Sequence, residues 1–146
     1  MSLDLQKAVD ATEDSMYASN TTGPTIATIL GGTNIPLANN QNLSSFTVNG
    51  ANDTFTVPMT GRYLISYQVN TTTALLVNTR IILNGATPIP GSIIDPVLSL
   101  AVFNNSMIVP LNAGDTITLQ LFGLLGSVTL IGGGATGAAL TIIRLA

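Results

Sequence analysis

Residues 55–67 read F-T-V-P-M-T-G-R-Y-L-I-S-Y and carry the clearest structural signal in the chain. The stretch begins with a short apolar strand, and residues 58–61 are of the types that form turns. From Gly61 to Thr71, apolar and polar side chains alternate, which indicates a strand with two distinct faces. One of these faces carries Tyr63, Ile65, Tyr67 and Val69. The stretch therefore predicts a strand, a turn and a second strand with an aromatic face.

The rest of the chain repeats this alternation of short β segments and turn residues. Asn49-Gly50 and Asn84-Gly85 are strong turn signals between such segments. Further strands are expected over residues 25–30, 43–48, 54–57, 75–83, 97–111, 116–124, 127–131 and 138–145. About eight to ten strands with no intervening helix predict an all-β fold, an antiparallel jelly-roll sandwich.

The chain is expected to consist of a short leader, residues 1–16, and one β domain, residues 17–146. Leu3 to Met16 is the only segment with helical spacing, and it is interpreted either as a frayed leader or as a short neck to something upstream. The charges within the first fifteen residues sum to −3, whereas those of the rest cancel. The body is therefore a neutral unit from which no electrostatic steering is expected.

The composition excludes several classes of function. The 146 residues include 13 Asn, 20 Thr and 10 Ser, only 8% are charged, and Cys, His and Trp are absent. Cysteine or histidine catalysis, disulfides and thiolate metal sites are thus excluded. Four basic residues are too few for a nucleic-acid surface. Residues 117–134 are interrupted by Thr, Gln, Ser and Gly, so no spanning helix is expected, and neither nucleic acid nor a membrane is expected as a partner.

No group of residues in the body predicts catalysis, a metal ion or a cofactor, and the protein is expected not to be an enzyme. Asp115 follows a glycine in a turn, where its carboxylate is expected to bind nearby backbone N–H groups. Asp53 lies in an oxygen-rich loop but lacks the second carboxylate of a calcium site. Arg62, Arg80 and Arg144 could bind an anion, or pair with Asp and cap carbonyls at an oligomer interface.

The late strands are apolar on both faces. In residues 140–145, Leu140 and Ile142 fall on one face while Ile143 and Leu145 fall on the other. A two-layer sandwich buries only one face of each sheet, and a monomer rarely exposes a large apolar surface. Two interpretations remain: a homo-oligomer buries the second face, or the chain's own loops cover it.

Two motifs resemble those of the tumour-necrosis-factor and complement globular-head jelly rolls. The first is the Phe, five-residue gap and G-x-Y pattern of residues 55–67, and the second is L-N-A-G-D-T-I-T-L at residues 111–119. The end of the chain, with L-F-G-L-L-G at residues 121–126 and A-L-T-I-I-R-L at 139–145, resembles the C-terminal domains of bacterial collagen-like spore-surface glycoproteins of the exosporium BclA type. The resemblance covers roughly residues 17–146.

The resemblance implies a homotrimer that forms the head of a collagen-like surface filament, located on the spore exosporium or the bacterial cell surface. Its partners would be two further copies and an upstream collagen-like stalk. The alternative is a head that binds a host receptor or glycan, which an exposed aromatic cluster would favour. The residues expected near the three-fold axis are Tyr63, Tyr67, Leu119, Leu121, Leu140 and Ile142.

Overall fold

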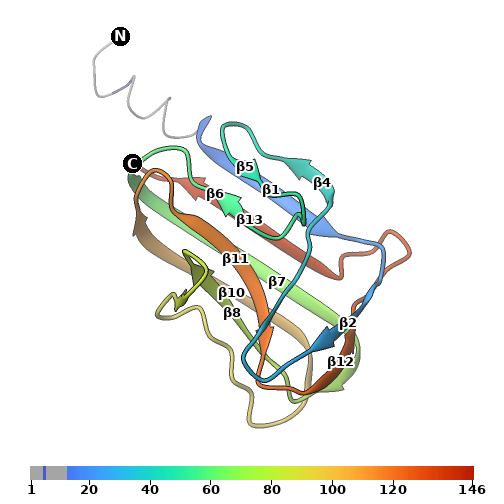
Figure 1. Cartoon of the computed structure of the whole chain (residues 1–146). Coiled ribbons are helices and arrows are strands. Elements are labelled where there is room, and N and C mark those ends of the chain that lie inside the picture. The colour runs from blue at the N-terminus through green and yellow to red at the C-terminus, as the bar shows by residue number, and fades with distance from the viewer. Residues whose placement is uncertain (1–4, 6–12) are drawn as a thin grey trace.

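A computed structural model of the chain describes residue 5 and residues 13–146. The described residues include thirteen strands, which form two layers (Figure 1). The strands before the long β7 are β1 (Ser15–Asn20), β2 (Thr25–Thr28), β3 (Thr33–Asn34), β4 (Asn39–Asn42), β5 (Thr47–Val48) and β6 (Phe55–Thr56). The remaining strands are β7 (Gly61–Leu75), β8 (Asn78–Leu83), β9 (Thr87–Pro88), β10 (Leu100–Leu111), β11 (Thr116–Phe122), β12 (Gly126–Thr129) and β13 (Ala138–Arg144).

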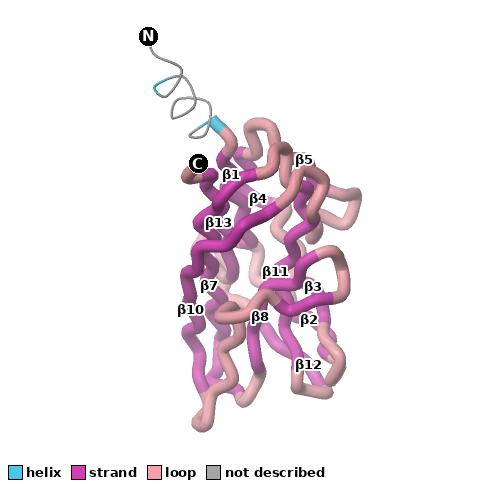
Figure 2. Tube along the Cα trace, turned by 90° about the vertical axis from the view of Figure 1, so that its left-hand side faces the viewer, coloured by secondary structure: helices cyan, strands magenta, loops and turns pink. Residues whose placement is uncertain are grey.

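All strand pairs in the described chain are antiparallel, and they form the jelly-roll sandwich that the sequence predicts. One layer is a five-stranded sheet in the order β10-β7-β13-β1-β4. The other contains β5-β6-β11-β8-β9, with β3 beside β11, and β12 pairs with β2 separately. Seen after a quarter turn, the sheets form two layers, and the C-terminus lies at the same end of the molecule as the start of β1 (Figure 2).

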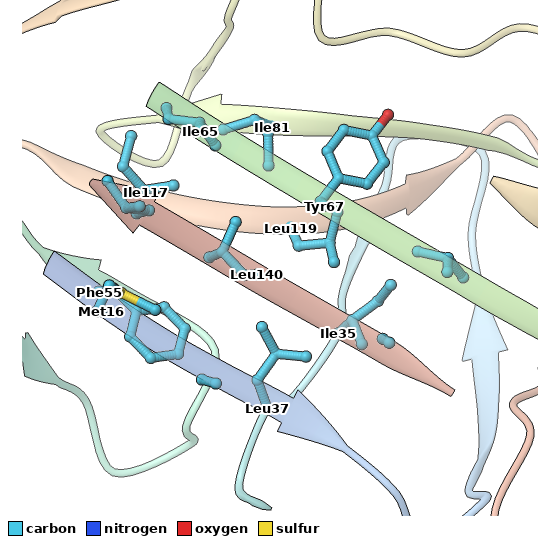
Figure 3. Packing of buried hydrophobic residues seen from close by; sticks show 14 of the residues in the cluster. Met16, Ile35, Leu37, Phe55, Ile65, Tyr67, Ile81, Ile117, Leu119 and Leu140 are labelled. Atoms are coloured by element: carbon cyan, nitrogen blue, oxygen red, sulfur yellow. The ribbon is translucent and has the colours of Figure 1, made fainter. Parts of the chain in front are cut away.

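The core lies between the two layers, where alternate residues of the strands meet (Figure 3). The aromatic face predicted for β7 points inward, since Tyr63, Ile65, Tyr67 and Val69 are all buried. Ile81 of β8 and Leu119 of β11 oppose this face from the second sheet. Each such aliphatic side chain contributes about 1.5–3 kcal/mol when it is removed from water.

Two buried tyrosines also make polar contacts inside the sandwich. The Tyr67 hydroxyl donates to the Ser92 carbonyl at 2.6 Å and lies 2.9 Å from the Thr79 hydroxyl. The Tyr63 hydroxyl donates to the Met59 carbonyl at 2.6 Å, and its ring packs edge-on against Phe46. Burial raises the pKa of both phenols above the ordinary value of 10.0, and for Tyr63 the nearby Asp14 charge raises it further.

Several turns agree with the sequence. Asn84 and Gly85 adopt left-handed backbone, with φ values of 54° and 72°, and close β8 onto β9. One carboxylate oxygen of Asp115 accepts a hydrogen bond from the Asn112 backbone N–H at 2.8 Å. The predicted role of Asp115 in its turn is thus confirmed.

The N-terminal boundary differs from the sequence prediction. The helix expected over residues 3–16 falls largely outside the described residues, and its last two residues, Ser15 and Met16, belong to β1. This strand reads S-M-Y-A-S-N, which carries little intrinsic β-propensity. Its pairing with β13 on one side and β4 on the other holds it in the sheet. Tertiary contacts therefore override the local sequence preference.

The contacts of the Tyr67 hydroxyl make a first prediction. Tyr67→Phe removes the donor to the buried Ser92 carbonyl, and an unsatisfied buried polar group costs about 1–3 kcal/mol. We expect the free energy of unfolding, measured by urea denaturation, to fall by about that amount. Tyr17→Phe is the matched control, because Tyr17 is 36% exposed and its change should be nearly neutral. Equal unfolding midpoints for the two variants would contradict the role of the buried hydroxyl.

The raised tyrosine pKa values make a second prediction. Above pH 10 the unfolded chain loses its phenolic protons before the folded chain does, so the stabilisation present below pH 10 is lost as the pH rises through the raised pKa values. Urea midpoints should change little from about pH 6 to 9 and then fall. In the Tyr67→Phe variant, the urea midpoint should decrease less above about pH 9, because this variant lacks one of the two buried phenols. A steep change between about pH 6 and 8 would contradict the prediction, because the chain has no histidine to titrate there.

Candidate functional site

The six residues that the sequence analysis places near a three-fold axis lie inside the protomer. Each of Tyr63, Tyr67, Leu119, Leu121, Leu140 and Ile142 is at most 3% exposed. Such side chains have almost no exposed surface, so the structure places them in the core of the protomer and not on a surface. Strand alternation shows which residues share a face, but β13 is apolar on both faces and does not reveal which one points inward.

The face of the five-stranded sheet that points away from the core, here called the open face, contains a row of aliphatic residues. Ile143 of β13 pairs with Leu64 of β7, and Leu64 pairs with Ile108 of β10. Ile108 is 51% exposed, and the other two are half-buried. Three adjacent strands thus present a continuous apolar row on the outside of the sandwich.

The neighbouring row of the open face consists of small hydroxyl side chains. Thr141, Ser66 and Ser106 are paired across β13, β7 and β10. The Ser106 hydroxyl donates to the Ser66 hydroxyl at 3.0 Å. In the next row, Gln68 pairs with Asn104. None of these side chains is charged, so covering these rows would require no desolvation of an ion. Among the described strands, the charged residue on this face is Arg62, two residues before Leu64 on β7.

Tyr17 of β1 lines both of two hollows on the open face. The first, of about 290 Å³, is lined by Tyr17, Ser66, Tyr67, Gln68, Val102, Asn104, Ala139 and Thr141. The second, of about 320 Å³, is lined by Ser15, Met16, Tyr17, Asn42, Thr141 and Ile143. The open face is therefore contoured, and a ridge or side chain from another molecule could fill these hollows.

Two carboxylates of the body, Asp53 and Asp115, make contacts that stabilise loops. Asp53 accepts hydrogen bonds from the side chains of Asn49 (2.9 Å) and Thr54 (2.9 Å). Asp115 accepts one from the Asn84 side chain at 3.1 Å. Within residue 5 and residues 13–146, no group of three His, Cys, Asp or Glu residues could hold a metal ion. The arrangement of these two carboxylates stabilises the loops in which they lie.

Two of the three arginines in the body make intramolecular contacts. Arg144 forms an ion pair with Asp14 at 2.9 Å, which ties the beginning of β1 to the end of β13. Arg80 lies 4.0 Å above the Phe122 ring and donates to the Gln120 side chain and the Gly31 carbonyl. Arg62 is exposed at the start of β7. Pairing and carbonyl capping thus account for Arg144 and Arg80 within a single protomer.

Comparisons with known proteins agree with this geometry. The structure is similar to that of murine APRIL, with a TM-score of 0.61 and 14% sequence identity over 90% of this chain and 98% of that one. It is also similar to pika GITRL, with a TM-score of 0.46 and 20% identity over 73% of this chain and 88% of that one. Curated protein sequences give no match. The strand order and the first of these similarities define a jelly roll of the tumour-necrosis-factor type.

Within that class, the chain belongs to the BclA C-terminal domain family, whose model matches residues 16–146. The match begins at the second residue of β1. It therefore includes β1 apart from Ser15, a strand that the sequence analysis divided between leader and domain. In the part of the chain that the structure describes, no helix has the length and apolar character needed to cross a membrane.

Proposed function

We propose that this chain is a non-enzymatic head domain that assembles as a homotrimer through its open face and forms part of a bacterial spore or cell surface. The observation that carries the proposal is the uncovered row formed by Leu64, Ile108 and Ile143 on a domain of the BclA C-terminal family. An assembly that covers this row is stabilised by about 25 cal/mol for each Å² of apolar surface that it removes from water. A specific interface is expected to exceed about 1,000 Å².

The composition of the open face suits a permanent contact between copies of one chain. Its apolar row supplies the hydrophobic term, while Ser66, Ser106 and Thr141 are small enough to allow close approach of backbones. Among the described strand residues that point outward on this face, Arg62 is the charged one, so assembly should depend only weakly on salt and on neutral pH. The three-fold symmetry in this proposal rests on the similarity to tumour-necrosis-factor-type proteins.

The position at which β1 begins supports a role in organising an upstream stalk. The Arg144 backbone N–H donates to the Asp14 carbonyl at 3.0 Å, so β1 begins beside the end of β13. A trimer of such heads with three-fold symmetry would hold the three β1 strands so that all of them begin at one end of the assembly. The high local concentration of the upstream stalk segments would favour nucleation and correct register of a collagen-like triple helix.

The distribution of aromatic side chains favours this structural role over a receptor- or glycan-binding head. Five of the seven aromatics, Phe46, Phe55, Tyr63, Tyr67 and Phe103, are buried. Phe122 is partly covered by Arg80, and Tyr17 lies alone on the open face. Aromatic anchors clustered on a surface are typical of recognition sites, and these seven side chains form no such cluster on the outside.

The open face makes a third prediction. The purified chain should have a solution mass three times its 15.0 kDa by light scattering at micromolar concentration. Ile108→Asp places a charge in the apolar row and should weaken assembly at least about tenfold, which corresponds to about 1.4 kcal/mol. Ile29→Asp is the control, because Ile29 is similarly exposed (56% against 51%) but lies outside the five-stranded sheet. A monomeric mass for the unmodified chain would refute the proposal.

The stalk role makes a fourth prediction. A collagen-like segment fused upstream of Leu3 should fold into its triple helix faster, and melt at a higher temperature, than the same segment alone. Circular dichroism would measure both quantities. The same fusion carrying Ile108→Asp is the control and should lose the advantage if assembly through the open face causes it. If the unmodified fusion assembled no better than the segment alone, a receptor-binding head would become the leading interpretation.

A further inference from the structure

The loops at the end of the sandwich away from the start of β1 lie close together. Leu75 at the end of β7 pairs with Leu100 at the start of β10, and Asn78 at the start of β8 pairs with Phe122 at the end of β11. The Gly123 backbone N–H donates to the Leu30 carbonyl at 3.0 Å. The β2–β3, β7–β8, β9–β10 and β11–β12 loops therefore converge at one end of the molecule (Figures 1 and 2).

These loops expose a set of aliphatic side chains, here called the apical cluster. Its members are Ile29 (56% exposed), Leu30 (64%), Leu76 (54%), Val97 (92%), Leu98 (77%) and Leu125 (72%). They stand on four separate loops, and exposure this high means that they project from the surface. A soluble monomer has no use for so many projecting aliphatic groups at one end.

The backbone that carries the apical cluster is anchored to the sandwich. Ile94 and Thr79 exchange two backbone hydrogen bonds of 2.9 and 3.1 Å, which fasten the β9–β10 loop to β8. The Gly32 backbone N–H donates to the Ile29 carbonyl at 3.2 Å, and the Arg80 side chain donates to the Gly31 carbonyl at 3.0 Å. The aliphatic side chains are thus presented outward from loops that are fastened beneath them.

The chemistry of the apical cluster is uniform. In residues 29–32, 76–77, 93–99 and 123–125, Asp95 is the only charged residue and none is aromatic. Arg80 and Phe122 lie beside these loops, but they contact each other, with Arg80 4.0 Å above the Phe122 ring. Surfaces that bind a polypeptide are usually rich in Trp, Tyr and Arg, which contribute most of the binding energy, and contain pockets that fit the partner. Projecting aliphatic groups without these anchors suit a fluid apolar phase, which needs no complementary shape.

We propose that the apical cluster inserts into the apolar region of an uncharged lipid layer, such as one of phosphatidylcholine. Lys and Arg would be needed to attract anionic lipid, and the lone Asp95 opposes it. Insertion of loop tips buries aliphatic groups at the boundary between headgroups and acyl chains without a spanning segment. The proposal departs from the expectation, made from the sequence, that a membrane is not a partner. Several heads on one particle would strengthen the attachment by multivalency.

Flotation of the purified chain with phosphatidylcholine vesicles tests the proposal. We expect the chain to float with the vesicles equally well at about 0.1 and 1 M salt, because no ion pair contributes. The double variant Val97→Ser/Leu98→Ser should bind at least about tenfold more weakly. The matched control is Met59→Ser/Leu145→Ser, which alters two exposed apolar residues (51% and 42%) at the opposite end and should bind like the unmodified chain.

Four results would overturn the proposal. Three concern the vesicles: an unmodified chain that does not float, an apical variant that floats like the unmodified chain, and binding that requires anionic lipid and disappears in salt. The fourth concerns the mass in solution without lipid. If the trimer mass doubled, and the apical variant restored the mass of a single trimer, the apical cluster would be covered by a second trimer and not by lipid. Equal unfolding midpoints would establish that the apical variant is folded. If it does not fold, Leu125→Ser replaces it. Ile108→Asp should still float, which separates a failure of this proposal from a failure of the trimer.

Discussion

The strand β7 couples the interior of this domain to its surface. Because successive side chains of a strand point to opposite faces, the backbone that carries Tyr63, Ile65 and Tyr67 into the core must carry Leu64 and Ser66 onto the open face. The neighbours β10 and β13 hold β7 along both edges, so their outward residues fall into register with its own. A shift of one residue would expose the tyrosines and destroy both faces together.

The sequence predicts the jelly-roll class and the long alternating strand because periodicity, turn residues and core packing agree there. It fails at β1, whose residues have weak β-propensity and are held by β13 and β4. It also assigns to a partner contact six side chains that the structure buries in the core. One signal could have corrected this: the face of β7 that carries the two tyrosines is bulky, whereas the other carries Ser66 and Gln68, and bulky apolar residues belong to the core.

This chain has few charges and a mean hydropathy of +0.50, yet its loops are well defined. Asparagine and threonine side chains replace ion pairs as the fasteners of turns. Asn49, for example, accepts hydrogen bonds from the backbone N–H groups of Asp53 and Thr54 and donates to the Asp53 carboxylate. Asn84 does the same between Thr116 and Asp115. Neutral fasteners leave few ions to desolvate, so two outer surfaces can be apolar without a charged rim.

Those two surfaces differ in physical character, and the difference indicates different kinds of partner. On the open face, the aliphatic row at Leu64 lies beside the hydroxyl row at Ser66, and Tyr17 lines both hollows, so a partner must match both shape and polarity. The apical cluster offers projecting aliphatic groups such as Val97 with no polar pattern to match. A surface that requires a match in shape and polarity binds a specific protein. Aliphatic groups without a polar pattern bind any phase that removes them from water. The side of the sandwich is thus suited to specific assembly, and its end is suited to a fluid apolar phase.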